Sequence, residues 1–212
     1  MASSEEIAEV AVTARTVLEA KHRARETMLT CARRTIQSCA ASIRAVHRDE
    51  MDRARELIAD ARAHLDEADA ALEGHPDIRY GSLLGDAKKE FTEANLTLAF
   101  VTGAALPTAT DLRVEIPAYL NGMAEAASEL RRQMLDRLRA GDLARAEELL
   151  GLMDDVYSVL VTIDYPDAIT GGLRRTTDAL RAVTERSRGD LTTTLVASRL
   201  QASIDSLLRQ SG

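Results

Sequence analysis

Aromatic residues are scarce in this chain: they make up 3% of its 212 residues, with no tryptophan and two phenylalanines. β-Sandwiches and β-barrels are usually rich in aromatic and β-branched residues, so this composition disfavours them. No stretch approaches the roughly 18 consecutive apolar residues of a membrane-spanning helix. The N-terminal sequence MASSEEIAEV also lacks the apolar core of a signal peptide. We therefore expect an all-α, cytoplasmic protein that does not associate with membranes.

The short motifs of several enzyme classes are also missing. The chain contains no CxxC, HExxH or GxSxG sequence and no phosphate-binding glycine loop. Its two cysteines, Cys31 and Cys39, are eight residues apart in one expected helix, too far apart to form a disulfide with each other. We expect two buried thiols in a reducing compartment, with no part in the chemistry.

Apolar residues at helical spacing predict a single domain, residues 1–212, of about seven helices with no β-sheet. The clearest stretch is 116–139, where Pro117 fits the first turn and Gly141 follows the last. Residues 78–105 carry apolar side chains on two faces, so this helix should be buried on both. The other helices are expected at 3–48 (one long helix or two nearly collinear ones), 49–72, 142–163, 166–188 and from 190 to the end, with a break at Gly189-Asp190.

Charge is unevenly distributed along the chain. The formal net charge is −7, yet the segment from Lys21 to Arg48 contains seven basic residues and one acid. This segment therefore carries +6 and the remainder −13. Such asymmetry suggests a local anion-binding surface on an acidic body. The alternative is a solvated helix face without a ligand.

Two pairs of glutamates stand at helical spacing. Glu90 and Glu93 are three residues apart in the helix with two apolar faces, and Glu125 and Glu129 are four apart in 116–139. A carboxylate caught between apolar faces needs a partner, a raised pKa or a metal ion. Four carboxylates from two helices could hold Mg²⁺ or Mn²⁺, which prefer oxygen ligands. The alternative is ordinary surface charge, with Glu129 paired to Arg132, because acid pairs are common on amphipathic helices.

Four stretches carry a resemblance to a known family: IRAVHR (43–48), DAKKEFTEA (86–94), IPAYLNGMAEAASELRR (116–132) and residues 153–194. Their order and spacing resemble the translin superfamily, in particular its prokaryotic, translin-like branch, over essentially the whole chain. The resemblance implies an all-α fold of seven helices that assembles into a hollow octamer and binds single-stranded RNA or DNA. In this family, translin is mainly a binding scaffold, whereas Trax-type subunits are metal-dependent endoribonucleases.

The resemblance also implies which residues form the site. Trax-type subunits carry a Glu-x-x-Glu on one helix and an Asp with a Glu four residues later on another. Glu90 and Glu93 match the first pair and Glu129 the final Glu, while Glu125 stands where the family's nuclease has Asp, so that an extra methylene alters the ligand distance. The implied nucleic-acid path includes Arg44, His47 and Arg48, with Arg79, Lys88 and Lys89 as further candidates near the acids.

Three functions follow as expectations. The first is a homo-octamer that binds single-stranded RNA, and also single-stranded DNA, and cleaves RNA with Mg²⁺ or Mn²⁺ at Glu90, Glu93, Glu125 and Glu129. The second is the same shell without catalysis. The third is a structural helical oligomer whose acids are only surface charge. Because few aromatic residues are available for base stacking, backbone contacts should dominate any nucleic-acid binding and make it sensitive to salt.

Overall fold

The computed structural model describes residues 3–79 and 82–210, apart from the side chains of residues 79 and 82. Within these residues there are nine helices and no strand, which confirms the all-α prediction. Three of the helices (α3, α5 and α8) are single turns in connecting segments. The helices are α1 (Ser4–Val46), α2 (Met51–Ala71), α3 (Pro76–Arg79), α4 (Ser82–Thr102), α5 (Ala109–Leu112), α6 (Ile116–Arg139), α7 (Leu143–Leu160), α8 (Asp167–Thr170) and α9 (Leu173–Gln210).

The predicted break at Gly189-Asp190 is wrong, because α9 continues through both residues. A glycine inside a helix costs only about 1 kcal/mol relative to alanine, and packing can outweigh that cost. Here Arg131 of α6 donates a hydrogen bond of 2.7 Å to the Asp190 carboxylate, and Leu191 is buried in the core. The prediction of one helix over 166–188 is also wrong, because Gly171 and Gly172 both have positive φ angles (62° and 84°) and separate α8 from α9.

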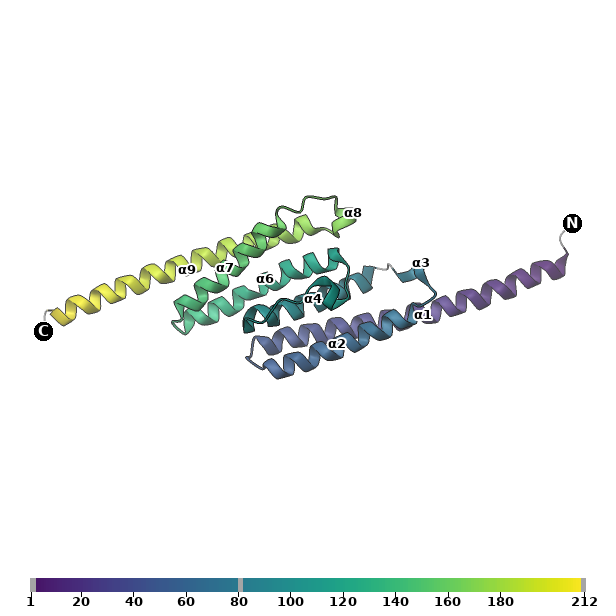
Figure 1. Cartoon of the computed structure of the whole chain (residues 1–212), viewed down its shortest axis with the longest axis horizontal. Coiled ribbons are helices and arrows are strands. Elements are labelled where there is room, and N and C mark those ends of the chain that lie inside the picture. Colours follow the sequence, from purple (N-terminus) through teal and green to yellow (C-terminus); the bar gives the residue numbers. More distant parts are fainter. Residues whose placement is uncertain (1–2, 80–81, 211–212) are drawn as a thin grey trace.

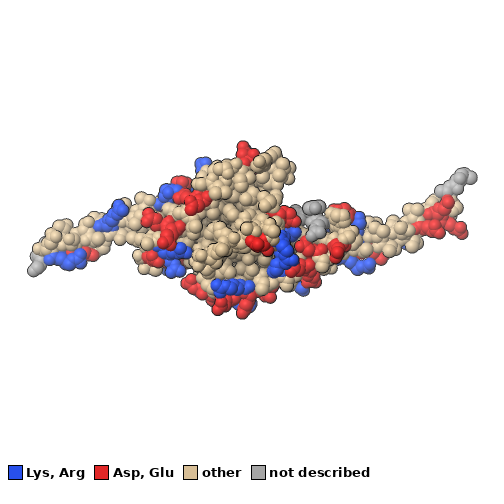
Figure 2. Space-filling view, in the orientation of Figure 1, with Lys and Arg blue, Asp and Glu red and all other residues tan. Residues whose placement is uncertain are grey.

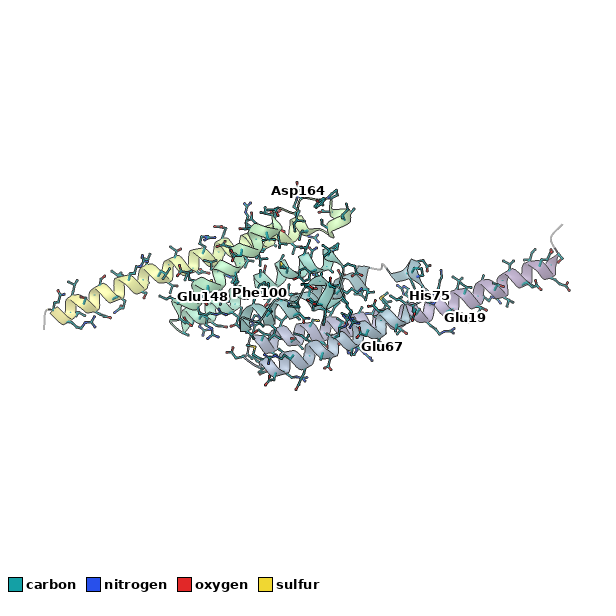
Figure 3. The ribbon with its side chains drawn as sticks, viewed as in Figure 1. Glu19, Glu67, His75, Phe100, Glu148 and Asp164 are labelled. Atoms are coloured by element: carbon teal, nitrogen blue, oxygen red, sulfur yellow. The ribbon has the colours of Figure 1, made fainter. Side chains whose placement is uncertain are left out.

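The helices form a layered bundle in which α4 and α6 are central (Figure 1). The α1–α2 hairpin covers one side of this pair, and α7 and α9 cover the other. One face of α4 enters the core with α1 and α2 through Leu84 and Phe91, and the other enters the core with α6, α7 and α9 through Leu96 and Phe100. Phe100 accordingly lies in the middle of the bundle (Figure 3). The prediction that this helix is buried on two faces is confirmed.

Both long helices extend well beyond the bundle, at opposite ends of the molecule (Figures 1 and 2). We call residues 4–19 of α1 the N-terminal arm and residues 196–210 of α9 the C-terminal arm. Nearly every residue of the two arms is exposed, including large apolar side chains. Among the described residues, no helix combines the length and the apolar composition needed to cross a membrane. The large exposed apolar residues are Ile7, Val10, Val12, Val17 and Leu18 on one arm and Val196, Leu200, Ile204, Leu207 and Leu208 on the other.

Small residues let α6 approach α4 closely. A Cβ atom added at Gly122 would lie 2.6 Å from the Lys89 carbonyl oxygen and 2.7 Å from Thr92 Cβ. Ala124 and Ala126, in the next turn of α6, are fully buried. Contacts this short leave no room for any larger residue at Gly122. The backbone of α6 therefore packs directly on the turn of α4 that carries Glu90 and Glu93.

Gly122→Ala should lower the free energy of unfolding by about 1–3 kcal/mol, because the added methyl group overlaps a backbone carbonyl that cannot move without shifting α4. Urea denaturation in the presence of a chelator measures this. Gly85→Ala on α4 is the control, since a Cβ there has no neighbour within 4 Å. Alanine at that position is expected to stabilise the helix by up to about 1 kcal/mol. A Gly122→Ala variant as stable as the wild type would contradict the close approach.

Candidate metal centre

Three of the four predicted glutamates converge between α4 and α6. Glu90 and Glu93 come from successive positions on one face of α4, and Glu125 comes from the turn of α6 that follows Gly122. One carboxylate oxygen from each lies within 4.8 Å of the other two. Three carboxylates this close can share a single cation.

The cluster is open to solvent on one side and closed at its base. The side chains of Glu90 and Glu125 are 26% and 31% exposed, whereas Glu93 is 9% exposed. Glu93 also makes no hydrogen bond or ion pair with any described residue. A buried carboxylate without a partner is costly. Mg²⁺ and Mn²⁺ favour such oxygen donors, so the residues present fit either ion.

The electrostatics of the cluster favour a bound cation. The pKa of Glu93 is raised to about 8, chiefly by burial and also by the negative charges of Glu90, Glu125 and Glu129, against the opposing effect of Lys89. Burial also raises the pKa of Glu90. Such shifts mean that the carboxylates are hard to ionise together without a compensating positive charge. Perturbed carboxyl groups in a partly open site are typical of functional centres.

Cys39 of α1 borders the same cluster. Its side chain is fully buried, and burial raises the pKa of its thiol, with further contributions from Glu90 and Glu93. The thiolate needed for metal binding is therefore disfavoured. Cys39 and Cys31 are both free and buried, as predicted.

Lys89 supplies a positive charge inside the cluster. Its Nζ lies 2.7 Å from Glu125 Oε1 and 3.6 Å from Glu90 Oε1. Burial lowers the pKa of Lys89, but the hydrogen bond to Glu125 and the neighbouring carboxylates raise it more, so that the net shift is upward. Lys89 was predicted as a nucleic-acid contact, yet in the structure its ammonium group binds the acids.

Glu129, the fourth predicted acid, is oriented by a histidine. His47 Nε2 and Glu129 Oε2 are 2.6 Å apart, and the His47 side chain is only 3% exposed. When the Glu129 carboxylate carries no proton it can only accept, and Nε2 is then the donor of this hydrogen bond. The same region of α1 is held by Gln133 Nε2, which donates to the Val46 carbonyl at 3.3 Å. Glu129 therefore pairs with His47 rather than with Arg132.

The other predicted nucleic-acid residues are distributed over different surroundings. Lys88 is 4% exposed and its Nζ lies 2.9 Å from Glu115 Oε1. We therefore do not include Lys88 among the proposed nucleic-acid contacts. The side chain of Arg79 lies outside the described residues. Arg48 is exposed and forms two 2.8 Å hydrogen bonds with Glu50. Arg44 is exposed and forms no ion pair with a described residue.

A shallow groove of about 550 Å³ lies on α6 beside Glu129. Arg132, in its wall, is exposed and forms no ion pair within the part of the chain that the structure describes, whereas Arg131 is held by Asp190. Sequence reasoning considered Arg132 only as a partner for Glu129, although its place one turn after that acid pointed to the site. The groove is lined by Ser128, Glu129, Arg131, Arg132, Leu135, Asp136 and Arg139.

Comparison with solved structures establishes the family. AfC3PO, solved alone and in complex with duplex RNA, is 31% identical to this chain, and the alignment covers 88% of this chain and 97% of AfC3PO. The TM-scores are 0.81 for the protein alone and 0.82 for the complex. The chain belongs to the translin superfamily. The resemblance that the sequence showed to this superfamily is thus confirmed.

Two further comparisons agree with membership of the translin superfamily. The structure of apo-NeC3PO shares the fold, with a TM-score of 0.75 over 87% of this chain and 96% of that one, at 17% identity. An uncharacterised protein, MJ0175 of Methanocaldococcus jannaschii, is 27% identical over 175 residues, which are 82% of this chain and 77% of that protein. No family model matches the sequence.

Glu93→Gln should stabilise the metal-free protein most at alkaline pH. Because folding raises the pKa of Glu93 from its ordinary 4.5 to about 8, the stability contributed by its protonated form is fully present below 4.5 and is lost as pH rises through 8. Glutamine does not ionise and avoids this loss. We expect a gain of roughly 1–3 kcal/mol at about pH 8.5 that shrinks toward about pH 4.5, measured by urea denaturation with chelator.

The control for this experiment is Glu147→Gln, which changes an exposed glutamate that forms no ion pair with a described residue. Its effect on the free energy of unfolding should be small at every pH. If Glu93→Gln changed stability equally at both pH values, the protonated, buried state of Glu93 would be refuted.

Proposed function

We propose that this protein is an RNA-binding homo-oligomer that cleaves single-stranded RNA with Mg²⁺ or Mn²⁺ held by Glu90, Glu93, Glu125 and Glu129. The observation that carries the proposal is the meeting of three carboxylates from two helices around Glu93, which is buried and has no hydrogen-bond partner in the described structure. When bound, the ion would supply Lewis acidity for hydrolysis of a phosphodiester.

The position of each glutamate in the site indicates its role. Glu90, Glu93 and Glu125 are close enough to ligate one ion. Glu129 borders both this cluster and the α6 groove, and His47 holds its carboxylate in one orientation. A carboxylate between an ion site and a substrate groove is well placed to accept the proton of an attacking water. We therefore assign Glu129 as a further ligand or as the general base.

RNA binding is supported by the relative and by the charge around the site. AfC3PO, at 31% identity, has been solved with duplex RNA. In this chain, Arg132 in the groove and Arg44 on α1 are exposed and have no ion pair with a described residue. Arginines of this kind neutralise phosphates, which gives binding that weakens with salt and reads little sequence. Single-stranded RNA is the substrate that we propose, with single-stranded DNA as a second ligand and duplex RNA as the comparison ligand.

The two arms support assembly into a homo-oligomer. Exposed apolar side chains at 64–69%, such as Ile7, Val10 and Leu208, are unfavourable in water and are typical of surfaces that a partner covers. The arms lie at opposite ends of the molecule, so identical copies can each contribute one to a neighbour (Figure 1). We propose the octamer implied by the family resemblance.

A non-catalytic binding shell is the second candidate function. It is favoured by the contact between Lys89 and Glu125, because an internal ammonium group already neutralises part of the acidic cluster. Metal-dependent cleavage separates the two candidates.

The free, buried cysteines fit a reducing compartment, and we propose that the protein acts in the cytoplasm.

Glu129→Ala should abolish metal-dependent cleavage, by at least about 100-fold, and leave RNA binding in chelator within about twofold of the wild type. The reason is that Glu129 acts on the reacting centre and carries no phosphate contact. The assay is cleavage of labelled single-stranded and duplex RNA with Mg²⁺, with Mn²⁺ and with chelator. Glu147→Ala is the control for loss of one negative charge. Undiminished cleavage by Glu129→Ala would refute the assignment of Glu129 to the catalytic site. Tight RNA binding without cleavage by the wild type would instead identify the protein as a non-catalytic binding shell.

Arg132→Gln should weaken binding of single-stranded RNA and lower the slope of log K against log salt by about 0.7, the value for one phosphate contact on a single strand. Fluorescence anisotropy at several salt concentrations, with chelator present to prevent cleavage, measures both effects. Arg55→Gln on α2, which removes an exposed arginine paired with Asp52, is the charge-matched control. Equal slopes for the two variants would exclude the α6 groove as part of the RNA path.

A further inference from the structure

We propose that Lys89 is an exchangeable cation of the acidic site: its ammonium group occupies the place between Glu125 and Glu90 that a divalent ion takes, and it moves out when the ion binds. The inference rests on the proposed metal site and adds a residue that sets the affinity of that site. It replaces the role in nucleic-acid binding that the sequence suggested for Lys89.

The contacts of Lys89 place its charge where a metal ion would be held. Its Nζ is 2.7 Å from Glu125 Oε1 and 3.6 Å from Glu90 Oε1. These two glutamates, with Glu93, have carboxylate oxygens within 4.8 Å of one another. A divalent ion shared by the three carboxylates and an ammonium group bound to two of them cannot occupy the same small space, and they repel each other.

Lys89 neutralises the cluster only in part. It contributes one positive charge among three carboxylates, and no contact joins its Nζ to Glu93 in the described structure. Glu93 is nine-tenths buried and lacks a hydrogen-bond partner there. An ion with six or more oxygen ligands can contact all three acids at once, which an ammonium group with three donors on a tethered stem does not do. The divalent ion is therefore the better occupant.

The side chain of Lys89 can leave without disturbing the fold. Its backbone is fixed, because its carbonyl oxygen packs against Gly122. Its side chain, however, is 25% exposed. It is a flexible four-carbon stem that ends in an ammonium group, and water hydrates that group strongly. The adjacent Lys88 differs in this respect, since it is 4% exposed and is held by Glu115. Of these two lysines, only Lys89 has both a contact with the acids and a path to solvent.

The test is the affinity of the whole protein for Mn²⁺, measured by the loss of the free Mn²⁺ signal in an electron paramagnetic resonance titration. Lys89→Met should bind Mn²⁺ at least about tenfold more tightly than the wild type, because no ammonium group has to be displaced. Mn²⁺ should also raise the melting temperature of Lys89→Met by more than it raises that of the wild type.

Two controls separate displacement from a general charge effect. Lys21→Met removes the same charge from an ion pair with Asp77, away from the acids, and should leave Mn²⁺ affinity unchanged. Lys89→Arg keeps the positive charge and should not tighten binding. Lys89→Gln, which retains a hydrogen-bond donor for Glu125, replaces the methionine variant if that variant does not fold, and should also bind more tightly.

The outcomes distinguish this inference from the proposed function. Equal or weaker Mn²⁺ binding by Lys89→Met, with binding by the wild type, overturns the exchange and leaves the metal site in place. It would mean that Lys89 holds Glu125 in position for the ion. Absence of Mn²⁺ binding by the wild type, by Lys89→Met and by Lys89→Gln overturns the metal site and the exchange together.

Discussion

The close approach of α6 to α4 at Gly122 is the constraint on which the site depends. Gly122 packs against the backbone of Lys89 and against Thr92, so the two helices cannot separate or slide without loss of this contact. Glu90 and Glu93 stand next to these residues on α4, and Glu125 stands one turn after Gly122 on α6. Rigid helices transmit the spacing of their backbones to their side chains, which is why a pair of small-residue contacts determines the distances among the carboxylates.

The acidic cluster lowers the stability of the fold locally, as functional sites often do. Burial and three neighbouring carboxylates raise the pKa of Glu93, and the positive charge of Lys89 offsets part of that cost. Lys89 binds Glu125, and His47 binds Glu129. These partners hold the outer acids, whereas the carboxylate of Glu93, at the base of the site, forms no hydrogen bond or ion pair with a described residue. An ion that reached all of them would stabilise the fold as well as supply the chemistry.

The departure from the family pattern at Glu125 has a structural answer. The family resemblance implies that glutamate stands there in place of the Asp of Trax-type nucleases, and its longer side chain could have carried the carboxylate away from the other acids. In the structure, Glu125 reaches Lys89 at 2.7 Å and remains within 4.8 Å of Glu90 and Glu93. The extra methylene is thus accommodated inside the cluster, where Glu125 forms an ion pair with Lys89.

Apolar periodicity by itself determined the all-α class, the bounds of α6 and the burial of α4 on two faces, because which residues share a helix face follows from local geometry. The acid pairs were visible for the same reason. The continuity of α9 through Gly189 could not be predicted from the sequence, because contacts from α6 outweigh the local preference of glycine. Lys88 and Lys89 are neighbours in sequence, yet Lys88 binds Glu115 and Lys89 binds Glu125. Their spacing in the sequence could not predict these different partners. Likewise, the pairing of His47 with Glu129 joins residues 82 positions apart, and only the packing of α1 on α6 decided it.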